Sequence, residues 1–305
     1  MKRNSFSFSG FILKIVAIIS ITFDHVGVFL NTLSTSSVFG SDIYYTISYL
    51  FRIIGRISFP IFIFLLVEGI RHTKNVYKYL FRLGMMMLII MIPEALIYHL
   101  FTTSIENAYS PFVDIFIIAL ILMLLNFKNK YSYLSIIPIA YILFTFVIQI
   151  YENTPIDGYF NKILWLPFYV RPGYSLFGLL LAIGFYYSKP LTNYLLKKKN
   201  NINDEQIELI QNTKEYHMMV NSYNLSTLII VNLLIFVLGR FVFINNYHIL
   251  DIYNYSLQNY SILSGLLLIF YNGQRGYNKK WFQYGCYIYF PMHIIILFLI
   301  FNVLL

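Results

Sequence analysis

Ionisable side chains lie inside the longest apolar runs of this sequence, where a charge is costly to bury. The run from Phe11 to Leu30 carries Lys14, Asp24 and His25. An ionisable residue in a membrane span raises the insertion free energy by about 2.5–3.5 kcal/mol, and such residues usually serve a function. A histidine can accept a proton, and a lysine can bind an anion. The residues therefore predict a polar site inside an apolar protein.

The spacing of Lys14 and His25 places both on one helix face. They are eleven residues apart, close to three helical turns, which separates them by about 16 Å along the axis. A lysine near the inner end suits a phosphate-bearing ligand, and a histidine higher up suits a proton acceptor because its ordinary pKa is near neutrality. Asp24 points about 100° away around the helix. Alternatively, Lys14 only extends to the lipid headgroups and His25 makes a structural helix contact.

Two arginines and a second histidine lie in other apolar runs. Arg52 and Arg56 are four residues apart and share a helix face. They can hold an anionic group or orient a substrate, or they can form structural ion pairs. The candidate partners for such pairs are Asp24, Glu94 and Asp114. His293 closely follows Pro291, which frees a backbone carbonyl and favours a polar surrounding, so we expect His293 to be functional.

Basic segments lie beside these runs. RHTKNVYKYLFR (71–82) contains Arg71 and Lys74, and YNGQRGYNKK (271–280) contains Arg275 among glycines. A glycine-rich turn with an arginine can bind phosphate through backbone N–H groups. The alternative for 71–82 is a positively charged anchor on the cytoplasmic side of a membrane. The single cysteine, Cys286, excludes a Cys-rich metal site, and we expect no bound metal.

The elements that position these residues are expected to be membrane-spanning helices. Of the 305 residues, 58% are hydrophobic and 11% are charged, and the mean hydropathy is +0.66. A soluble domain carries roughly 25% charged residues, so this composition excludes one. We expect an all-α polytopic membrane protein, a single domain over 1–305, with about nine spans in one bundle. The spans are 11–30, 43–70, 83–101, 112–127, 133–150, 163–187, 225–244, 259–272 and 283–304.

The distribution of positive charge predicts the orientation of these spans. With the N-terminus inside, 16 of the 22 Lys and Arg fall on the cytoplasmic side, and the outer loops hold only Lys162. Cytoplasmic loops retain positive charge, so we expect an N-in, C-out topology. The inner loop 188–224 is expected to be a partly helical or mobile connector. The second and sixth spans are over-long, and we expect each to be kinked or partly non-spanning because they are broken by Gly55, Pro60, Pro167, Pro172 and Gly173.

Five stretches of the sequence resemble the TraX family of membrane acetyltransferases, whose best-known type acetylates the N-terminus of conjugative pilin. They run in family order: LKIVAIISITFDHVG (13–27), LFRIIGRISFPIFIFLLVEGIRHTKNVYKYLFRLG (50–84), SPFVDIFIIALIL (110–122), RPGYSLFGLLLAI (171–183) and FYNGQRGYNKKWFQYGCYIYFPMHIIIL (270–297). The Lys14-to-His25 spacing also resembles the arginine-to-histidine spacing in the first helix of the wider acyltransferase-3 group.

The resemblance implies transfer of an acetyl group from cytosolic acetyl-CoA to an amine or hydroxyl of an exported peptide or glycan. It implies that His25 is the general base, or a transient acetyl carrier, and that Asp24 orients or stabilises it. Arg52, Arg56 and His293 would stabilise the oxyanion or orient the acceptor. The CoA phosphates would meet the basic residues Lys14, Arg71, Lys74 and Arg275.

Two other functions would use the same residues. A proton-coupled secondary transporter would also need buried charges, although the sequence shows no internal repeat of the kind found in many transporters. A passive membrane factor for assembly of a cell-surface structure would tolerate neutralisation of the buried charges one at a time. The missing repeat and the asymmetric basic inner surface count against a transporter, and the number of ionisable residues inside spans counts against a passive factor. We expect no nucleic-acid partner.

Overall fold

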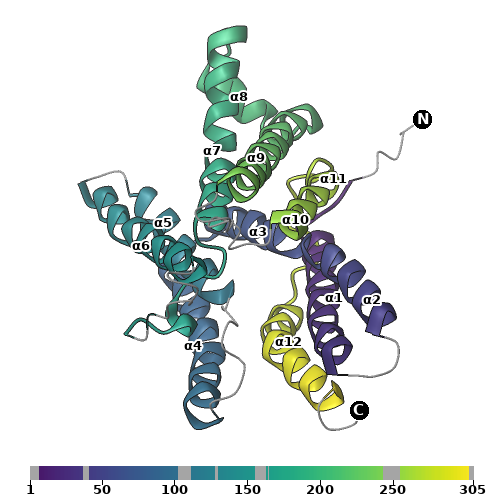
Figure 1. The fold of residues 1–305 in the computed structure, drawn as a ribbon. Helices are drawn as coiled ribbons and strands as arrows, with labels where there is room; N and C mark the ends of the chain where they lie inside the picture. The colour runs from purple at the N-terminus through teal and green to yellow at the C-terminus, as the bar shows by residue number, and fades with distance from the viewer. Residues whose placement is uncertain are drawn as a thin grey trace. The chain divides into compact units, whose positions relative to one another are not determined.

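The computed structural model describes residues 7–36, 41–101, 111–127, 130–154, 163, 165–242 and 255–301. Its α-helices are α1 (Gly10–Ser36), α2 (Ser41–Gly55), α3 (Ser58–His72), α4 (Val76–Phe101), α5 (Pro111–Leu125), α6 (Ile136–Asn153), α7 (Ser175–Asn200), α8 (Asp204–Ile210), α9 (Lys214–Phe241), α10 (Tyr255–Gln258), α11 (Gly265–Leu268) and α12 (Lys280–Leu299) (Figure 1). The 3₁₀-helices are η1 (Lys130–Ser135), η2 (Phe168–Val170) and η4 (Asn259–Ser264).

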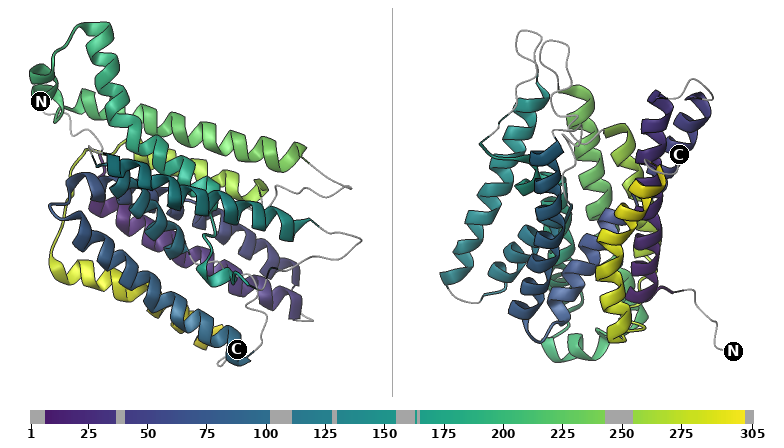
Figure 2. Two further views of the ribbon diagram at one scale, coloured as in Figure 1. Left: turned by 90° about the vertical axis from the view of Figure 1, so that its left-hand side faces the viewer. Right: turned by 90° about the horizontal axis from the view of Figure 1, so that it is seen from below.

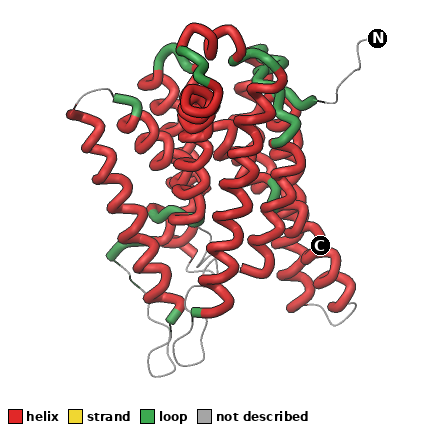
Figure 3. Tube along the Cα trace, turned by 90° about the horizontal axis from the view of Figure 1, so that it is seen from above, coloured by secondary structure: helices red, strands yellow, loops and turns green. Residues whose placement is uncertain are grey.

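Helix accounts for almost all of the described chain (Figure 3). Within the described ranges, strand-like pairing is limited to one isolated parallel bridge between Phe8 and Tyr271. The long apolar runs explain this result, because a helix satisfies its backbone hydrogen bonds within one segment, as a membrane requires. The all-α fold expected from the sequence is therefore confirmed for the described residues.

Seven helical segments of the described residues are long and apolar enough to cross a membrane. They are Gly10–Asn31, Asp42–His72, Val76–Pro93, Lys130–Asn153, Phe168–Lys199, Lys214–Phe241 and Lys280–Leu299. The other two expected spans take different forms: α5 has only 15 residues, and the stretch 259–272 contains η4 and the four-residue α11. The structure thus supports a multi-pass membrane protein with seven candidate spans, and the count of nine is not confirmed.

Exposed apolar side chains on these helices agree with a lipid environment. Ile229, Ile230 and Leu233 are exposed on α9, and Ile295 and Ile296 are exposed on α12. A soluble monomer rarely exposes contiguous apolar surface of this kind. Lipid tails do not penalise it, so the exposed faces are consistent with membrane spans.

Two expected spans are interrupted near glycine and proline. α2 ends at Gly55 and α3 begins at Ser58, whose hydroxyl donates to the Gly55 carbonyl oxygen at 2.7 Å. Pro60 lies in the first turn of α3, where a missing N–H removes no helix hydrogen bond. In the sixth expected span, η2 precedes Pro172, and α7 begins only at Ser175. The expected interruptions of these two spans are confirmed.

The expected inner loop 188–224 is mainly helical. It comprises the end of α7, all of α8 and the start of α9. The Asn203 side chain accepts the Gln206 backbone N–H at 2.9 Å, and the Gln206 side chain accepts the Asn203 N–H at 3.0 Å. This reciprocal capping box explains why α8 begins here. The Lys197–Asp204 ion pair, 2.6 Å long, joins the end of α7 to the first residue of α8.

The chain divides into two compact units. The first contains Met1–Leu65, Gly184–Asn232 and Ser256–Leu305, and the second contains Leu66–Ile183 and Leu233–Tyr255. In the core of the first unit, the Phe64 ring meets Phe185 and Tyr271 edge to face, with centroids 5.8 and 5.0 Å away. In the second unit, α5 has nine buried residues among its 15, so this helix forms much of the core.

Candidate active site

The first and last long helices bring two histidines together in the first unit. Nδ1 of His25 on α1 lies 2.7 Å from Nε2 of His293 on α12, although 268 residues separate them in sequence. α1 and α12 lie side by side (Figures 1 and 2). The ring centroids are 4.9 Å apart and the planes differ by 19°. This separation is about the N···N distance plus the two ring radii, so the rings meet edge to edge in a hydrogen bond.

Tyr289 holds the ring of His293. Nδ1 of His293 lies 2.9 Å from the Tyr289 carbonyl oxygen, and the two rings stack with centroids 4.9 Å apart and planes 6° apart. The Tyr289 hydroxyl is hydrogen-bonded to the Thr22 hydroxyl, which itself donates to the Ile18 carbonyl oxygen at 2.8 Å. α1 and α12 are therefore joined by polar contacts at two levels, Thr22 with Tyr289 and His25 with His293.

Asp24, the residue before His25, forms a largely buried ion pair with Arg56. Nη2 of Arg56 is 3.2 Å from Oδ1 of Asp24, and the two side chains are 10% and 16% exposed. Nη1 of Arg56 donates to Oε1 of Gln258 at 3.4 Å. Position 55 lies directly against the Asp24 side chain, where a Cβ atom would overlap it. Gly55 therefore lets the turn between α2 and α3 approach α1 and place Arg56 beside Asp24.

Arg52 lies on α2 where this helix packs on α1. A Cβ atom at Gly27 would be 2.8 Å from Cγ of Arg52, and the Ser48 hydroxyl donates to the Gly27 carbonyl oxygen at 2.7 Å. Sequence spacing placed Arg52 and Arg56 on one helix face, but α2 ends at Gly55. Arg56 therefore belongs to the turn that follows, while Arg52 remains on the helix. All five residues expected to be catalytic lie in the first unit.

Buried polar side chains support this arrangement from α9. Asn221 donates to the Tyr271 carbonyl oxygen at 2.7 Å, and the Ser261 hydroxyl donates to Oδ1 of Asn232 at 2.8 Å. Asn221, Asn232, Ser261 and Gln258 are each at most 3% exposed. These contacts anchor the segment 255–271 to α9. This segment carries Gln258, whose side-chain oxygen accepts the hydrogen bond from Arg56.

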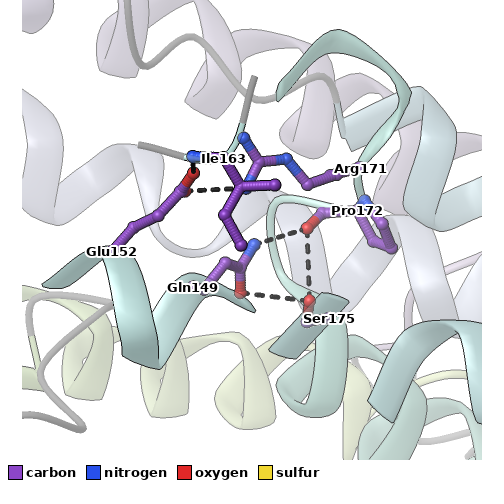
Figure 4. A network of polar contacts seen from close by, with 6 residues as sticks. All are labelled: Gln149, Glu152, Ile163, Arg171, Pro172 and Ser175. Atoms are coloured by element: carbon purple, nitrogen blue, oxygen red, sulfur yellow. Dashed lines mark hydrogen bonds and ion pairs between the residues drawn. The ribbon is translucent and has the colours of Figure 1, made fainter. Parts of the chain in front are cut away.

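The second unit has a polar network of its own (Figure 4). Nη1 of Arg171 donates to Oε2 of Glu152 at 2.7 Å, and Oε1 of Glu152 accepts the Ile163 N–H at 2.8 Å. Gln149 donates to the Pro172 carbonyl oxygen and accepts from the Ser175 hydroxyl. The close-up shows these side chains converging on the segment before α7.

Asp114, which the sequence offered as a partner for the arginines, instead caps the start of α7. Its fully buried carboxylate accepts the backbone N–H groups of Gly173, Tyr174 and Ser175 at 2.7–3.1 Å. A carboxylate is well placed at a helix N-terminus, where backbone N–H groups lack helical partners. This network is therefore best explained as structural. The side chain of Glu94 lies outside the described part of the structure.

Two of the four residues expected to meet phosphates lie together in the first unit. Lys14 is in electrostatic range of Arg275. The turn that carries Arg275 is attached to the start of α1, because the Gly10 and Phe11 N–H groups donate to its carbonyl oxygens at 2.8 and 3.0 Å. The first two N–H groups of α1 already have hydrogen-bond acceptors within the protein. An anion in this region would therefore meet basic side chains, of which Lys14 and Arg275 are two.

The other two residues, Arg71 and Lys74, lie in the second unit. Nη1 of Arg71 is 2.6 Å from Oε1 of Glu68, so this guanidinium group is engaged in an ion pair. Lys74 is exposed and lines a pocket of about 350 Å³ with Tyr77 and Asn126. Among the described residues, no group of three or more His, Cys, Asp or Glu side chains is arranged to hold a metal ion.

Sequence reasoning missed three residues of the site. Tyr289 lies four residues before His293 and Thr22 three residues before His25, so each shares a helix face with a predicted histidine. That spacing was the signal that could have identified them. Gln258 had no comparable signal, because its partner Arg56 lies 202 residues away in sequence.

These features define a multi-pass membrane protein in which a hydrogen-bonded histidine pair adjoins, in sequence, a largely buried carboxylate–guanidinium pair. The chain belongs to the TraX family, since the model of that family, described as TraX protein, matches residues 9–171. The matched range contains Asp24, His25 and Arg56 and ends before His293.

A shorter stretch is similar to a curated bacterial protein. It is 40% identical over 83 residues to the "Probable fimbrial assembly protein FimC, serogroup H1" of Dichelobacter nodosus. The alignment covers 27% of this chain and 30% of that protein, so less than a third of the length of each is compared. No solved structure matches the chain.

Proposed function

We propose that this TraX-family protein is an integral-membrane acyltransferase, which moves an acetyl group from cytosolic acetyl-CoA to an amine or hydroxyl of an exported acceptor. One observation carries the proposal: His25 is hydrogen-bonded to His293 in the same unit as the largely buried Asp24–Arg56 pair. A neutral histidine can act as a base, and a guanidinium group can stabilise developing negative charge. Acyl transfer can use a base to activate the acceptor and a positive group to stabilise the oxyanion.

The proposed reaction begins when His25 accepts the proton of the acceptor as its nitrogen or oxygen attacks the thioester carbonyl carbon. A C–N or C–O bond forms, the C–S bond breaks, and the proton passes to the departing thiolate. Arg52 and Arg56 are the groups that would stabilise the negative carbonyl oxygen. In the covalent alternative, His25 carries the acetyl group before the acceptor attacks. Both routes require an unprotonated ring nitrogen on His25.

The charge distribution supports a cytoplasmic donor. Lys14 and Arg275 would bind the phosphate groups of acetyl-CoA, with Arg71 and Lys74 as further candidates. The excess of Lys and Arg in the inner segments supports an N-in, C-out orientation in the bacterial plasma membrane. Similarity to a protein named for fimbrial assembly supports an exported pilin-type peptide as acceptor, and a cell-surface glycan is the alternative.

Acetyl transfer by purified protein tests this proposal. In detergent, the wild-type protein should release free CoA thiol from acetyl-CoA only when an amine or hydroxyl acceptor is present. His25→Ala should lower this rate by at least about 10²-fold, because general base catalysis contributes about 10²–10⁴-fold. His72→Ala is the matched control, since the His72 side chain is 58% exposed and lies in the second unit. Equal rates in wild type and His25→Ala would refute the mechanism.

A passive assembly factor is the second candidate function, and the similarity to the fimbrial assembly protein favours it. Such a factor would act through its surface and would not need the chemistry of His25. In cells that use the protein for pilus assembly, His25→Ala would then leave assembly unchanged. An acyltransferase predicts loss of acceptor acetylation in the same cells, measurable by mass spectrometry of the exported acceptor.

A further inference from the structure

We propose that His293 is a positioning residue, which fixes His25 in the tautomer whose Nε2 atom carries no proton. His293 would then not be a hydrogen-bond donor to the oxyanion. The kinetic consequence rests on the proposed acyl transfer, whereas the tautomer itself follows from the hydrogen bonds around the two rings. The proposal gives His293 a different role from the one the family resemblance implied.

The argument starts at the carbonyl group of Tyr289. A carbonyl oxygen can only accept, so Nδ1 of His293, 2.9 Å away, carries a proton and donates it. A neutral imidazole has one N–H group, which leaves Nε2 of His293 with a lone pair. A charged ring here would add another buried charge to the apolar span, which is costly. Nε2 of His293 is therefore a hydrogen-bond acceptor.

This acceptor decides the tautomer of His25. Nδ1 of His25 lies 2.7 Å from Nε2 of His293, so Nδ1 of His25 must carry the proton of that hydrogen bond. Nε2 of His25 is then the unprotonated nitrogen and the atom that accepts a proton. The Thr22–Tyr289 hydrogen bond and the stacked Tyr289 ring hold His293 in place for this contact.

The same hydrogen bonds prevent His293 from acting as an oxyanion donor. Both of its ring nitrogens are engaged, Nδ1 with the Tyr289 carbonyl oxygen and Nε2 with His25. When Nε2 of His25 accepts a proton, its Nδ1–H group still donates to His293. The ring of His25 therefore keeps its orientation throughout proton transfer, as the orienting residue of a hydrolase triad achieves for its histidine. Stabilisation of the oxyanion falls to Arg52 and Arg56.

Two substitutions at position 293 separate the positioning role from a donor role. His293→Leu removes the acceptor, so kcat should fall about 10- to 100-fold, with the KM for acetyl-CoA unchanged. His293→Glu keeps an acceptor, and an ionised carboxylate cannot donate, so kcat should stay within about 10-fold of wild type. An oxyanion donor predicts the opposite order, because a carboxylate would repel the oxyanion. Lower kcat for His293→Glu than for His293→Leu would overturn the proposal.

Nitrogen NMR of protein labelled with ¹⁵N-histidine measures the tautomer without any reaction. The His25 signals, identified by their loss in His25→Ala, should show a protonated Nδ1 and a bare Nε2. In His293→Leu, the proton should move to Nε2. A protonated Nε2 in the wild-type protein would overturn the proposal. The wild-type measurement is sufficient by itself if His293→Leu does not fold. If the tautomer is found but no acetyl transfer occurs, the proposed function fails and the positioning role stands.

Discussion

At the scale of single residues, the position of the Asp24–Arg56 ion pair, largely removed from solvent, requires an explanation. Both side chains are largely removed from solvent, and their closest contact is 3.2 Å. Burying an ion pair costs desolvation free energy, so replacing both partners with apolar residues often leaves stability unchanged or raises it. A pair kept only for stability would therefore be a poor solution. Its presence beside His25 favours a role for the Arg56 guanidinium group in chemistry.

Replacing one partner of the pair, and then both, distinguishes a structural role of the pair from a role of Arg56 in catalysis. Arg56→Leu leaves the Asp24 carboxylate buried without its guanidinium partner, so the free energy of unfolding should fall by about 3–5 kcal/mol. The double variant Asp24→Leu with Arg56→Leu should recover most of that loss but should still lack acetyl transfer. Thermal unfolding in detergent and initial rates on the same preparations measure both quantities.

An exposed ion pair provides the control for this experiment. In the Lys197–Asp204 pair, the side chains are 45% and 84% exposed, so Lys197→Ala should change stability by no more than about 1 kcal/mol. A double variant at positions 24 and 56 that transfers acetyl groups at the wild-type rate would show that the pair is structural.

The sequence was informative about which residues matter and less informative about which of them meet. Asp24, His25, Arg56 and His293 stood out because ionisable residues are rare in apolar runs, and the structure places all four in one unit. The sequence could not show that His25 contacts His293, because a hydrogen bond between residues 268 positions apart depends on tertiary packing. It offered Asp114 as a partner for the arginines, whereas backbone N–H groups bind this carboxylate.

At the scale of elements, the close approach of the α2–α3 turn to α1 positions the site. It depends on Gly55, where a Cβ atom would overlap the side chain of Asp24. Gly55→Ala should therefore destabilise the protein by about 1–3 kcal/mol, as overpacking usually does, and should shift Arg56 away from α1. Acetyl transfer should fall together with the unfolding temperature measured in detergent.

Gly285 provides a control that shows whether the effect of Gly55→Ala arises from packing. A Cβ atom at Gly285 in α12 would meet nothing within 4 Å. Gly285→Ala should leave the free energy of unfolding within about 1 kcal/mol of wild type, in the stabilising direction, because alanine has the higher helix propensity. Equal destabilisation by both substitutions would contradict the role given to the close approach at position 55.

Element boundaries were predicted best where glycine and proline mark them. The break between α2 and α3 falls at Gly55, and α7 begins just after Pro172 and Gly173. Hydropathy alone could not show that the stretch 259–272 would contain η4 and the short α11, because 3₁₀ geometry does not change the apolar composition of a segment. Nor could it show how completely α5 is buried, because a buried helix and a lipid-facing helix are both apolar.

At the scale of the whole molecule, α5 and the segment 255–268 decide on which side of the membrane each terminus lies. With seven crossings, or with nine if α5 and the segment 255–268 both cross, the two termini lie on opposite sides of the membrane. If only one of them crosses, the termini lie on the same side. α5 is about 22 Å long at 1.5 Å per residue, shorter than a hydrocarbon core of about 30 Å. Its extensive burial allows it to cross, since neighbouring helices can shield its ends from lipid.

Single cysteines placed in a Cys286→Ser background test both crossings in intact cells with a membrane-impermeant thiol reagent. The substitutions are Asn75→Cys, Asn126→Cys, Trp165→Cys and Gln274→Cys, all at exposed positions. With the N-terminus inside and nine crossings, position 165 should be labelled, and positions 75, 126 and 274 should react only after the cells are opened. Labelling at 126 with protection at 165 would show that α5 does not cross. Labelling at 274, with 126 protected, would show that the segment 255–268 does not cross and would place the C-terminus in the cytoplasm.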